Sequence, residues 1–230
     1  MQRRGAAQED HRSGGRSMAT ARRLPMPALS APEGAPVSPE PPGYPCELER
    51  EVLSGSLRYH VRPIRPEDGP KLVAFHAKLS PRSVYLRFFS AHPTLSDAEV
   101  TRFTAVDYED RLALIATVGD DLIAVARYDR TPGGSDAEVA FVVDDVYQHH
   151  GIGSELLDEL ADAAFARGVT TFRAETLAEN RTMLDVFHHA GFAVESTVAF
   201  GTVTLRFPIA PTAASIAARA ARGRRTGAAG

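Results

Sequence analysis

The feature that most constrains the fold is a change of hydrophobic periodicity between residues 136 and 168. The segment DAEVAFVV places apolar residues at every second position, and this period is typical of a β-strand. Beyond the segment QHHGIG, apolar residues recur at helical spacing on one face: Leu156, Leu157, Leu160, Ala164 and Phe165. The sequence therefore predicts a strand, a short turn that contains Gly151 and Gly153, and a long amphipathic helix.

Two glycines at the start of a helix need a physical reason. Serine, threonine, aspartate and asparagine cap helices better, and a glycine inside a helix costs about 0.5–1 kcal/mol relative to alanine. The first turn of a helix presents unpaired backbone N–H groups and the positive end of the helix dipole. Residues without side chains let an anion approach these groups, so we expect an anion-binding site between Gln148 and Ser154.

The remaining segments alternate between strand and helix patterns, with Gly and Pro at the turns. Strands are predicted for LRYHVRPI, RLALIATVG, DLIAVARYDR, DAEVAFVV and TFRAETL, and a final hairpin for FAVESTVAFGTVTLRF. Further helices are predicted for residues 67–79, for SVYLRFF and SDAEVTRFTA, and for residues 180–190. This order predicts an α+β domain over residues 57–210, with a mostly antiparallel mixed sheet, one parallel crossover and flanking helices.

The two ends of the chain differ in composition from this domain. Residues 1–56 are rich in proline, alanine and arginine and are predicted to form a disordered tail; residues 211–230 are predicted to form a second, basic one. No apolar run approaches the ~18 residues of a membrane span and no signal peptide is recognisable, so a cytoplasmic protein without membrane contact is expected. The single cysteine, Cys46, predicts no internal disulfide, and no metal site is expected.

The charge distribution bears on the partner. Residues 59–210 carry 14 basic and 22 acidic side chains, whereas residues 1–25 and 211–230 are both basic. Nucleic-acid binding needs a basic face, so nucleic acid is not expected as the partner of the predicted domain. An acidic domain favours a cationic substrate.

The order of these motifs resembles the GNAT superfamily of N-acetyltransferases. The helix-start signature of that family is Gln or Arg, two residues, Gly, any residue, then Gly or Ala, and Gln148, Gly151 and Gly153 match it. Asn180 and the pair Gly191 and Phe192 match the second half of the fold. The resemblance covers about residues 57–208 and implies the GNAT fold and an acetyl-CoA-dependent N-acetyltransferase.

The resemblance also implies where acetyl-CoA, the acyl-donor substrate, is held. Its pyrophosphate is expected at the helix start, and its pantetheine arm beside the end of the preceding strand. The implied binding residues are Phe141, Val142, Val143, Gln148, His149, His150, Gly151, Ile152, Gly153, Ser154 and Asn180. His149 and His150 stand where the family often has Gly and Arg, so the backbone is expected to do most of the phosphate binding. Asn180 either binds the pantetheine arm or caps its own helix.

Four segments are similar to a narrower group, the bacterial protein lysine acetyltransferases: RPIRPEDGPKLVAFHAKLSPRSVYLRFFS, LSDAEV, VDYEDRLALIA and VARYDR. The GNAT domain of that group is often fused to an acyl-CoA synthetase-like or cyclic-nucleotide-binding domain. The resemblance implies acetyl transfer to exposed lysines of proteins such as acyl-CoA synthetases. Two alternatives stay open: a GNAT enzyme that acetylates a small-molecule amine or a protein N-terminus, and a non-catalytic acyl-CoA-binding module.

Acetyl transfer to lysine needs a general base, because an amine of pKa ~10.4 is protonated at neutral pH. Along DAEVAFVV, the period of two places Glu138 on one face with Ala140 and Val142. The catalytic glutamate of the resembling group falls on this strand, so the resemblance assigns the base role to Glu138. The alternative is a solvated carboxylate at the entrance of the strand.

Two further features bear on the chemistry. Asp107, Glu109 and Asp110 form an acidic loop that either steers a cationic lysine or is simply solvated. Many GNAT enzymes have a tyrosine after the conserved asparagine that protonates the leaving thiolate, and the matching residue here is Phe187. Phenylalanine donates no proton, so the thiolate is expected to leave unaided or to take its proton from water.

Overall fold

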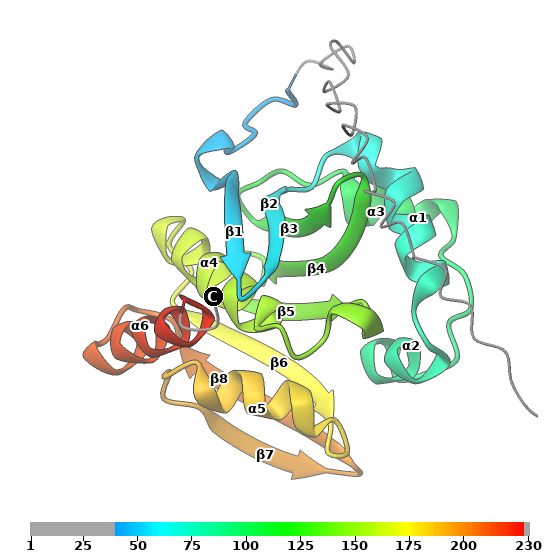
Figure 1. The fold of residues 1–230 in the computed structure, drawn as a ribbon. Coiled ribbons are helices and arrows are strands. Elements are labelled where there is room, and N and C mark those ends of the chain that lie inside the picture. The colour runs from blue at the N-terminus through cyan, green and yellow to red at the C-terminus, as the bar shows by residue number, and fades with distance from the viewer. Residues whose placement is uncertain (1–39, 228–230) are drawn as a thin grey trace, which may run out of the picture. The chain divides into compact units, whose positions relative to one another are not determined.

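An eight-stranded sheet forms the centre of residues 40–227, the part of the chain that the computed structural model describes (Figure 1). Its strands are β1 (Arg50–Ser54), β2 (Leu57–Pro63), β3 (Arg111–Val118), β4 (Asp121–Arg130), β5 (Asp136–Val143), β6 (Thr171–Leu177), β7 (Glu195–Ala199) and β8 (Thr202–Pro208). They lie in the order β1-β2-β3-β4-β5-β6-β8-β7, and within this sheet only β5 and β6 pair in parallel. The predicted α+β class with a mostly antiparallel mixed sheet is confirmed.

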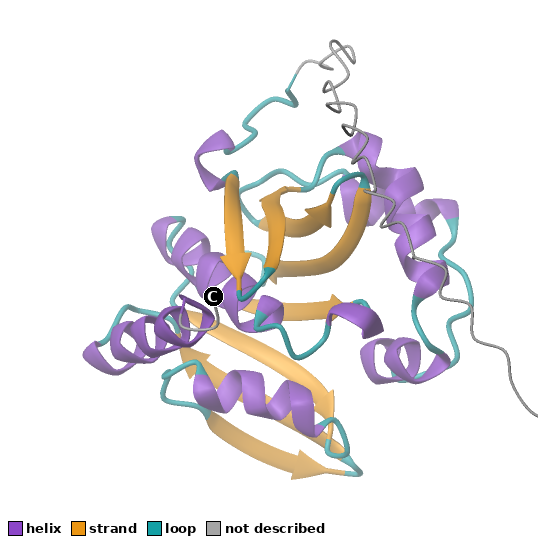
Figure 2. Ribbon diagram, viewed as in Figure 1, coloured by secondary structure: helices purple, strands orange, loops and turns teal. Residues whose placement is uncertain are grey.

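Helices cover both faces of the sheet (Figure 2). They are α1 (Gly69–Lys78), α2 (Pro81–Phe88), α3 (Asp97–Thr104), α4 (Ile152–Ala166), α5 (Arg181–His189) and α6 (Ala213–Gly227). The central strand β3 is buried on both sides: Leu112 and Leu114 belong to the core around α4, and Ala113 and Ile115 to the core around α1. Such two-sided burial explains why β3 reads as a continuous apolar run.

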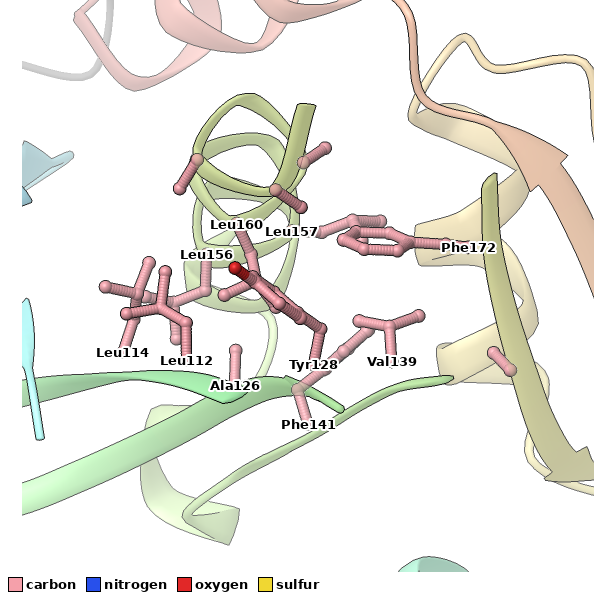
Figure 3. Packing of buried hydrophobic residues seen from close by; sticks show 14 of the residues in the cluster. Leu112, Leu114, Ala126, Tyr128, Val139, Phe141, Leu156, Leu157, Leu160 and Phe172 are labelled. Atoms are coloured by element: carbon pink, nitrogen blue, oxygen red, sulfur yellow. The ribbon is translucent and has the colours of Figure 1, made fainter. Parts of the chain in front are cut away.

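The larger core lies between α4 and the sheet. Leu156, Leu157 and Leu160 of α4 are fully buried and point toward side chains of β3, β4 and β5 (Figure 3). Burying each such leucine contributes about 1.5–3 kcal/mol relative to leaving it exposed, before the cost in chain entropy. The apolar face predicted for this helix is confirmed, except that Phe165 is exposed. This packing fixes the start of α4 against the end of β5.

Strands β5 and β6 stay together over only three residue pairs, Asp136↔Thr171, Ala137↔Phe172 and Glu138↔Arg173. Beyond these pairs the two strands diverge, as Figure 1 shows, although β5 remains paired with β4 as far as Val143. The main chain of β5 from residue 139 to 143 therefore has no strand partner on its β6 side. We call this opening the splay.

The described structure extends beyond the domain limits that the sequence predicts. Strand β1 lies within the predicted N-terminal tail and forms a hairpin with β2 through a turn at Gly55, whose φ is 61°. Helix α6 lies within the predicted C-terminal tail, where Arg219 forms ion pairs with Asp158 and Asp162 of α4. Tertiary contacts thus order segments whose composition alone indicates a tail. The rest of the predicted N-terminal tail, residues 1–39, lies outside the described residues.

Candidate functional site

A cleft of about 510 Å³ opens where the start of α4 meets the end of β5. Its lining residues come from α2, β5, α4 and α5 and include ten of the eleven predicted acetyl-CoA residues: Phe141, Val142, Val143, Gln148, His149, Gly151, Ile152, Gly153, Ser154 and Asn180. The exception is His150, which is exposed and lies outside the lining. The sequence motif and the strand before it thus meet in one concave site.

The start of α4 leaves backbone donors free toward this cleft. The N-cap residue Gly151 supplies no side-chain cap, whereas Ser80, Ser96 and Asn180 cap the helices that follow them. Among the described residues, the N–H groups of residues 152–154 find no acceptor, and the first that does is Glu155, which donates to the Gly151 carbonyl at 3.0 Å. Free N–H groups and the positive helix end make this turn suitable for an anion.

The two glycines also have structural reasons of their own. Gly151 has φ 77°, a left-handed conformation that side chains disfavour. A Cβ at Gly153 would lie 3.3 Å from Cε2 of Phe141, so the helix start approaches β5 closely there. The prediction explained these glycines only by the approach of an anion; backbone conformation and packing against Phe141 require them as well.

A hydrogen-bond network ties α2 to the loop between β5 and α4. The Asp145 carboxylate accepts from the Ser80 N–H at 2.9 Å and from the Ser83 hydroxyl at 2.7 Å. Gln148 donates through Nε2 to the Val143 carbonyl at 3.2 Å and lies 3.4 Å from the Ser83 oxygen. Partial burial alone would raise the pKa of Asp145, but these hydrogen bonds from Ser80 and Ser83 bring it below its ordinary value.

Sequence reasoning missed this network. Its members are separated by more than sixty residues, and the one local signal is the Ser80-Pro81 pair, which is typical of a helix start.

The two histidines of the motif, His149 and His150, have different surroundings. His149 lines the cleft and has φ 65°, which is uncommon for a residue with a Cβ. The carbonyl of His150 accepts a hydrogen bond of 2.6 Å from the Ser54 hydroxyl at the end of β1. Strand β1, which the sequence did not predict, therefore contacts the turn of residues 148–153, the motif turn, through Ser54.

Asn180 lies in the wall of the cleft and caps α5. Its Oδ1 accepts from the Met183 N–H at 3.2 Å, and the residue is 8% exposed. Its amide nitrogen has no hydrogen bond to any described residue and stays available to a ligand. The two predicted roles of Asn180 are therefore compatible.

A second cavity of about 70 Å³, the splay pocket, lies between β5 and β6. Glu138 lines it, and four residues line both this pocket and the large cleft: Leu86, Arg87, Phe141 and Met183. The two spaces therefore adjoin through the splay. Glu138 is exposed, and its register partners are Asp129 on β4 and Arg173 on β6. The candidate base thus lines the splay pocket but not the large cleft that contains the helix start.

Phe187 also lines the splay pocket. Its ring is 2% exposed and packs against Phe141 at 5.4 Å and against Phe207 at 5.5 Å between centroids. This position belongs to the core and presents no hydroxyl to the splay.

The acidic loop lies apart from these cavities. Asp107 accepts hydrogen bonds from the N–H groups of Glu109 and Arg111, and Asp110 forms an ion pair with Arg130 at 3.3 Å. These acids do not line the cleft or the splay pocket. The geometry gives Asp107 a local role in shaping the turn.

Metal ions and membranes are two further classes of partner to consider for residues 40–227. No group of three or more His, Cys, Asp or Glu side chains there is arranged to hold a metal ion. No helix in this part of the chain is long and apolar enough to cross a membrane.

Comparison with known proteins shows the family. The chain is 40% identical to the GNAT domain of PAT from S. lividans; the match covers 72% of this chain and 99% of that domain, with a TM-score of 0.68. The chain belongs to the GNAT acetyltransferase family. The sequence model of that family matches residues 81–192, which contain the motif turn, Glu138 and Asn180. The prediction of a GNAT acetyltransferase is therefore confirmed.

Two further relatives extend this result. Acetyltransferase Pat of Mycolicibacterium smegmatis is 34% identical over 137 residues, which cover 58% of this chain and 40% of that protein. The chain thus spans less than half the length of that GNAT relative. An acetyltransferase from Salmonella typhimurium, solved with its cofactor acetyl-CoA, shares the fold with a TM-score of 0.55 at 17% identity; it covers 68% of this chain and 97% of its own.

Proposed function

We propose that this chain transfers the acetyl group of acetyl-CoA to the ε-amino group of lysines on proteins. The observation that carries the proposal is the uncapped start of α4, which opens into a cleft that adjoins the pocket of Glu138. Similarity to Pat and to the GNAT domain of PAT supports a protein acceptor. Acyl-CoA synthetases are the acceptor class that the resemblance favours.

In this proposal, acetyl-CoA lies along the cleft. Its pyrophosphate accepts hydrogen bonds from the free N–H groups of residues 152–154. Its pantetheine amides pair with the main chain of β5 between residues 139 and 143, where the splay leaves that strand without a partner on one side. The amide nitrogen of Asn180, at the start of α5, holds the arm; its availability within the lining of the cleft supports this role. The thioester then lies at the splay.

The acceptor amine enters from the side of Glu138. This carboxylate accepts, directly or through a water, the proton that the ammonium must lose before it can attack. The amine nitrogen forms a bond to the thioester carbonyl carbon, the carbon–sulfur bond breaks, and CoA leaves as a thiolate. Because Phe187 has no hydroxyl, the proton that the new amide nitrogen gives up reaches the thiolate through water. Backbone N–H groups of β5 near Phe141 polarise the thioester carbonyl.

The test is incubation of the purified chain with radiolabelled acetyl-CoA and a native cell lysate, with Glu138→Gln as the control. Discrete labelled protein bands that disappear with the variant are the expected result. Label confined to the small-molecule fraction would identify a small amine as the acceptor. Binding of acetyl-CoA with no transfer to either fraction would identify a non-catalytic acyl-CoA-binding module.

A further inference from the structure

Arg87, in the last turn of α2, lies between the cleft proposed for acetyl-CoA and the pocket of Glu138. It lines the large cleft with Phe141 and the splay pocket with Glu138. It also lines a third cavity of about 40 Å³ beneath α1 and α2. Its side chain is half-buried and its guanidinium lies over the Phe88 ring, 5.2 Å from the centroid, but within residues 40–227 it has no hydrogen bond and no ion pair. The five N–H donors of this guanidinium are therefore available to a side chain that moves into reach or to a ligand that binds.

Three other charged residues around Glu138 already have partners. Arg173 on β6 forms an ion pair with Asp136 at 2.5 Å, and Asp129 on β4 forms one with Arg111 at 3.0 Å. Arg127 on β4 donates to the Phe103 carbonyl at 2.8 Å and stacks over the Phe103 ring. Among these arginines of the described chain, Arg87 is therefore the one whose guanidinium has no hydrogen bond and no anionic partner, since its printed contact is with the Phe88 ring.

The pKa of Arg87 reflects both its burial and the acids around it. Burial lowers the pKa of the Arg87 guanidinium, and the negative charges of Glu138 and Asp129 partly oppose that effect. A half-buried cation without an anionic partner is unfavourable, and a carboxylate that approaches it relieves part of the cost. The exposed side chain of Glu138 is free to make that approach.

We infer that Arg87 is the positioning residue for Glu138: its guanidinium draws the carboxylate into the splay pocket and holds it beside the incoming amine. This inference rests on the proposed function, since it assumes that Glu138 is the base. The two opposite charges attract, and the planar guanidinium presents its donors in the geometry that a carboxylate accepts. The carboxylates of Asp129, Asp136 and Glu175 instead repel the carboxylate of Glu138.

The experiment compares Arg87→Gln, Arg87→Lys, Glu138→Gln and the double variant Arg87→Gln/Glu138→Gln. The readout is the initial rate of label transfer from saturating radiolabelled acetyl-CoA to native lysate, protein and small-molecule fractions together, from about pH 6 to about pH 10. The rise in melting temperature with acetyl-CoA shows that each variant is folded and binds the donor.

Arg87→Gln should lower the rate at neutral pH roughly 10- to 100-fold, because the carboxylate is then no longer held beside the amine. Arg87→Lys keeps the charge and should restore most of the wild-type rate. The double variant should be about as slow as Glu138→Gln, because Arg87 acts through that carboxylate.

Either of two results would overturn the inference: equal losses from Arg87→Gln with and without Glu138, or an Arg87→Lys variant as slow as Arg87→Gln. A different result tests the proposed function itself. If Glu138→Gln transfers label at the wild-type rate, the base assignment fails, whatever Arg87 does.

Discussion

At the scale of single residues, His149 carries backbone strain in the motif turn. Its φ of 65° costs a residue with a Cβ about 1–2 kcal/mol, whereas glycine adopts this conformation freely but loses more chain entropy on folding. His149→Gly should therefore raise the free energy of unfolding by about 0.5 kcal/mol, measured by urea denaturation. His150→Gly is the matched control and should destabilise, because His150 has no positive φ. A loss of stability in His149→Gly would contradict this explanation.

Glu138→Gln tests the proposed base. The variant keeps the size and hydrogen-bonding shape of the side chain but cannot accept the proton, and loss of a general base typically costs 10²- to 10⁴-fold in rate. Turnover at neutral pH should fall by about that factor while acetyl-CoA affinity stays unchanged. Activity should partly recover in alkali, where the amine loses its proton to solvent. Turnover at pH 7 equal to the wild type would remove Glu138 from the mechanism.

Asp145 gives a prediction about acid stability. The hydrogen bonds from Ser80 and Ser83 bring its pKa below the ordinary value, so folding favours the ionised carboxylate. The stability that it contributes is complete above the pKa of an unfolded aspartate, about 3.9, and is lost as pH falls through the lower native pKa.

Asp145→Asn should therefore be less stable than the wild type at neutral pH, and this difference should shrink below about pH 4. Urea midpoints measured as a function of pH check it. A difference that stays constant down to low pH would mean that the ionised carboxylate is not what stabilises α2.

At the scale of elements, the uncapped start of α4 is tested best at Ser154. A glutamate there suits the positive end of the helix, so folding is preserved, yet its carboxylate competes with and repels a pyrophosphate. Ser154→Glu should abolish the rise in melting temperature with acetyl-CoA, and Ser154→Gln, of equal size and no charge, should retain most of it. Equal shifts in the two variants would place the phosphates elsewhere. Gly153 is less suitable for this test, because any Cβ there meets Phe141.

The periodicity of the sequence predicts most helices and strands. Strand β1 and helix α6 are exceptions, because contacts with distant segments stabilise them. Strand β1 has a mixed pattern with Leu53 exposed, so its hairpin with β2 has little local signal. Helix α6 is an alanine- and arginine-rich segment that is held by ion pairs to Asp158, more than fifty residues earlier. The motif residues of the site were predictable because their spacing is local. Arg87, Ser83 and Asp145 were not, because the fold brings them together from distant segments.

At the scale of the whole molecule, acetyl-CoA should stabilise the folded chain. A ligand that binds only the folded state adds RT ln(1 + [L]/Kd), about 2.7 kcal/mol at one hundred times Kd. The melting temperature should therefore rise with acetyl-CoA concentration. Pantetheine, which lacks the pyrophosphate, should give a smaller rise at the same concentration. Absence of any shift at millimolar acetyl-CoA would contradict the assignment of the cleft.

The splay has a consequence for how the protein behaves when its donor is scarce. A strand with unpaired amides and carbonyls on one side is a template for pairing with another chain, and such edges normally lie at the margins of a sheet. Here the edge lies in the interior, at β5, because β6 leaves it after three residue pairs. If the proposed donor site is correct, bound acetyl-CoA covers this edge, and loss of the donor leaves an unpaired strand exposed in the interior of the sheet.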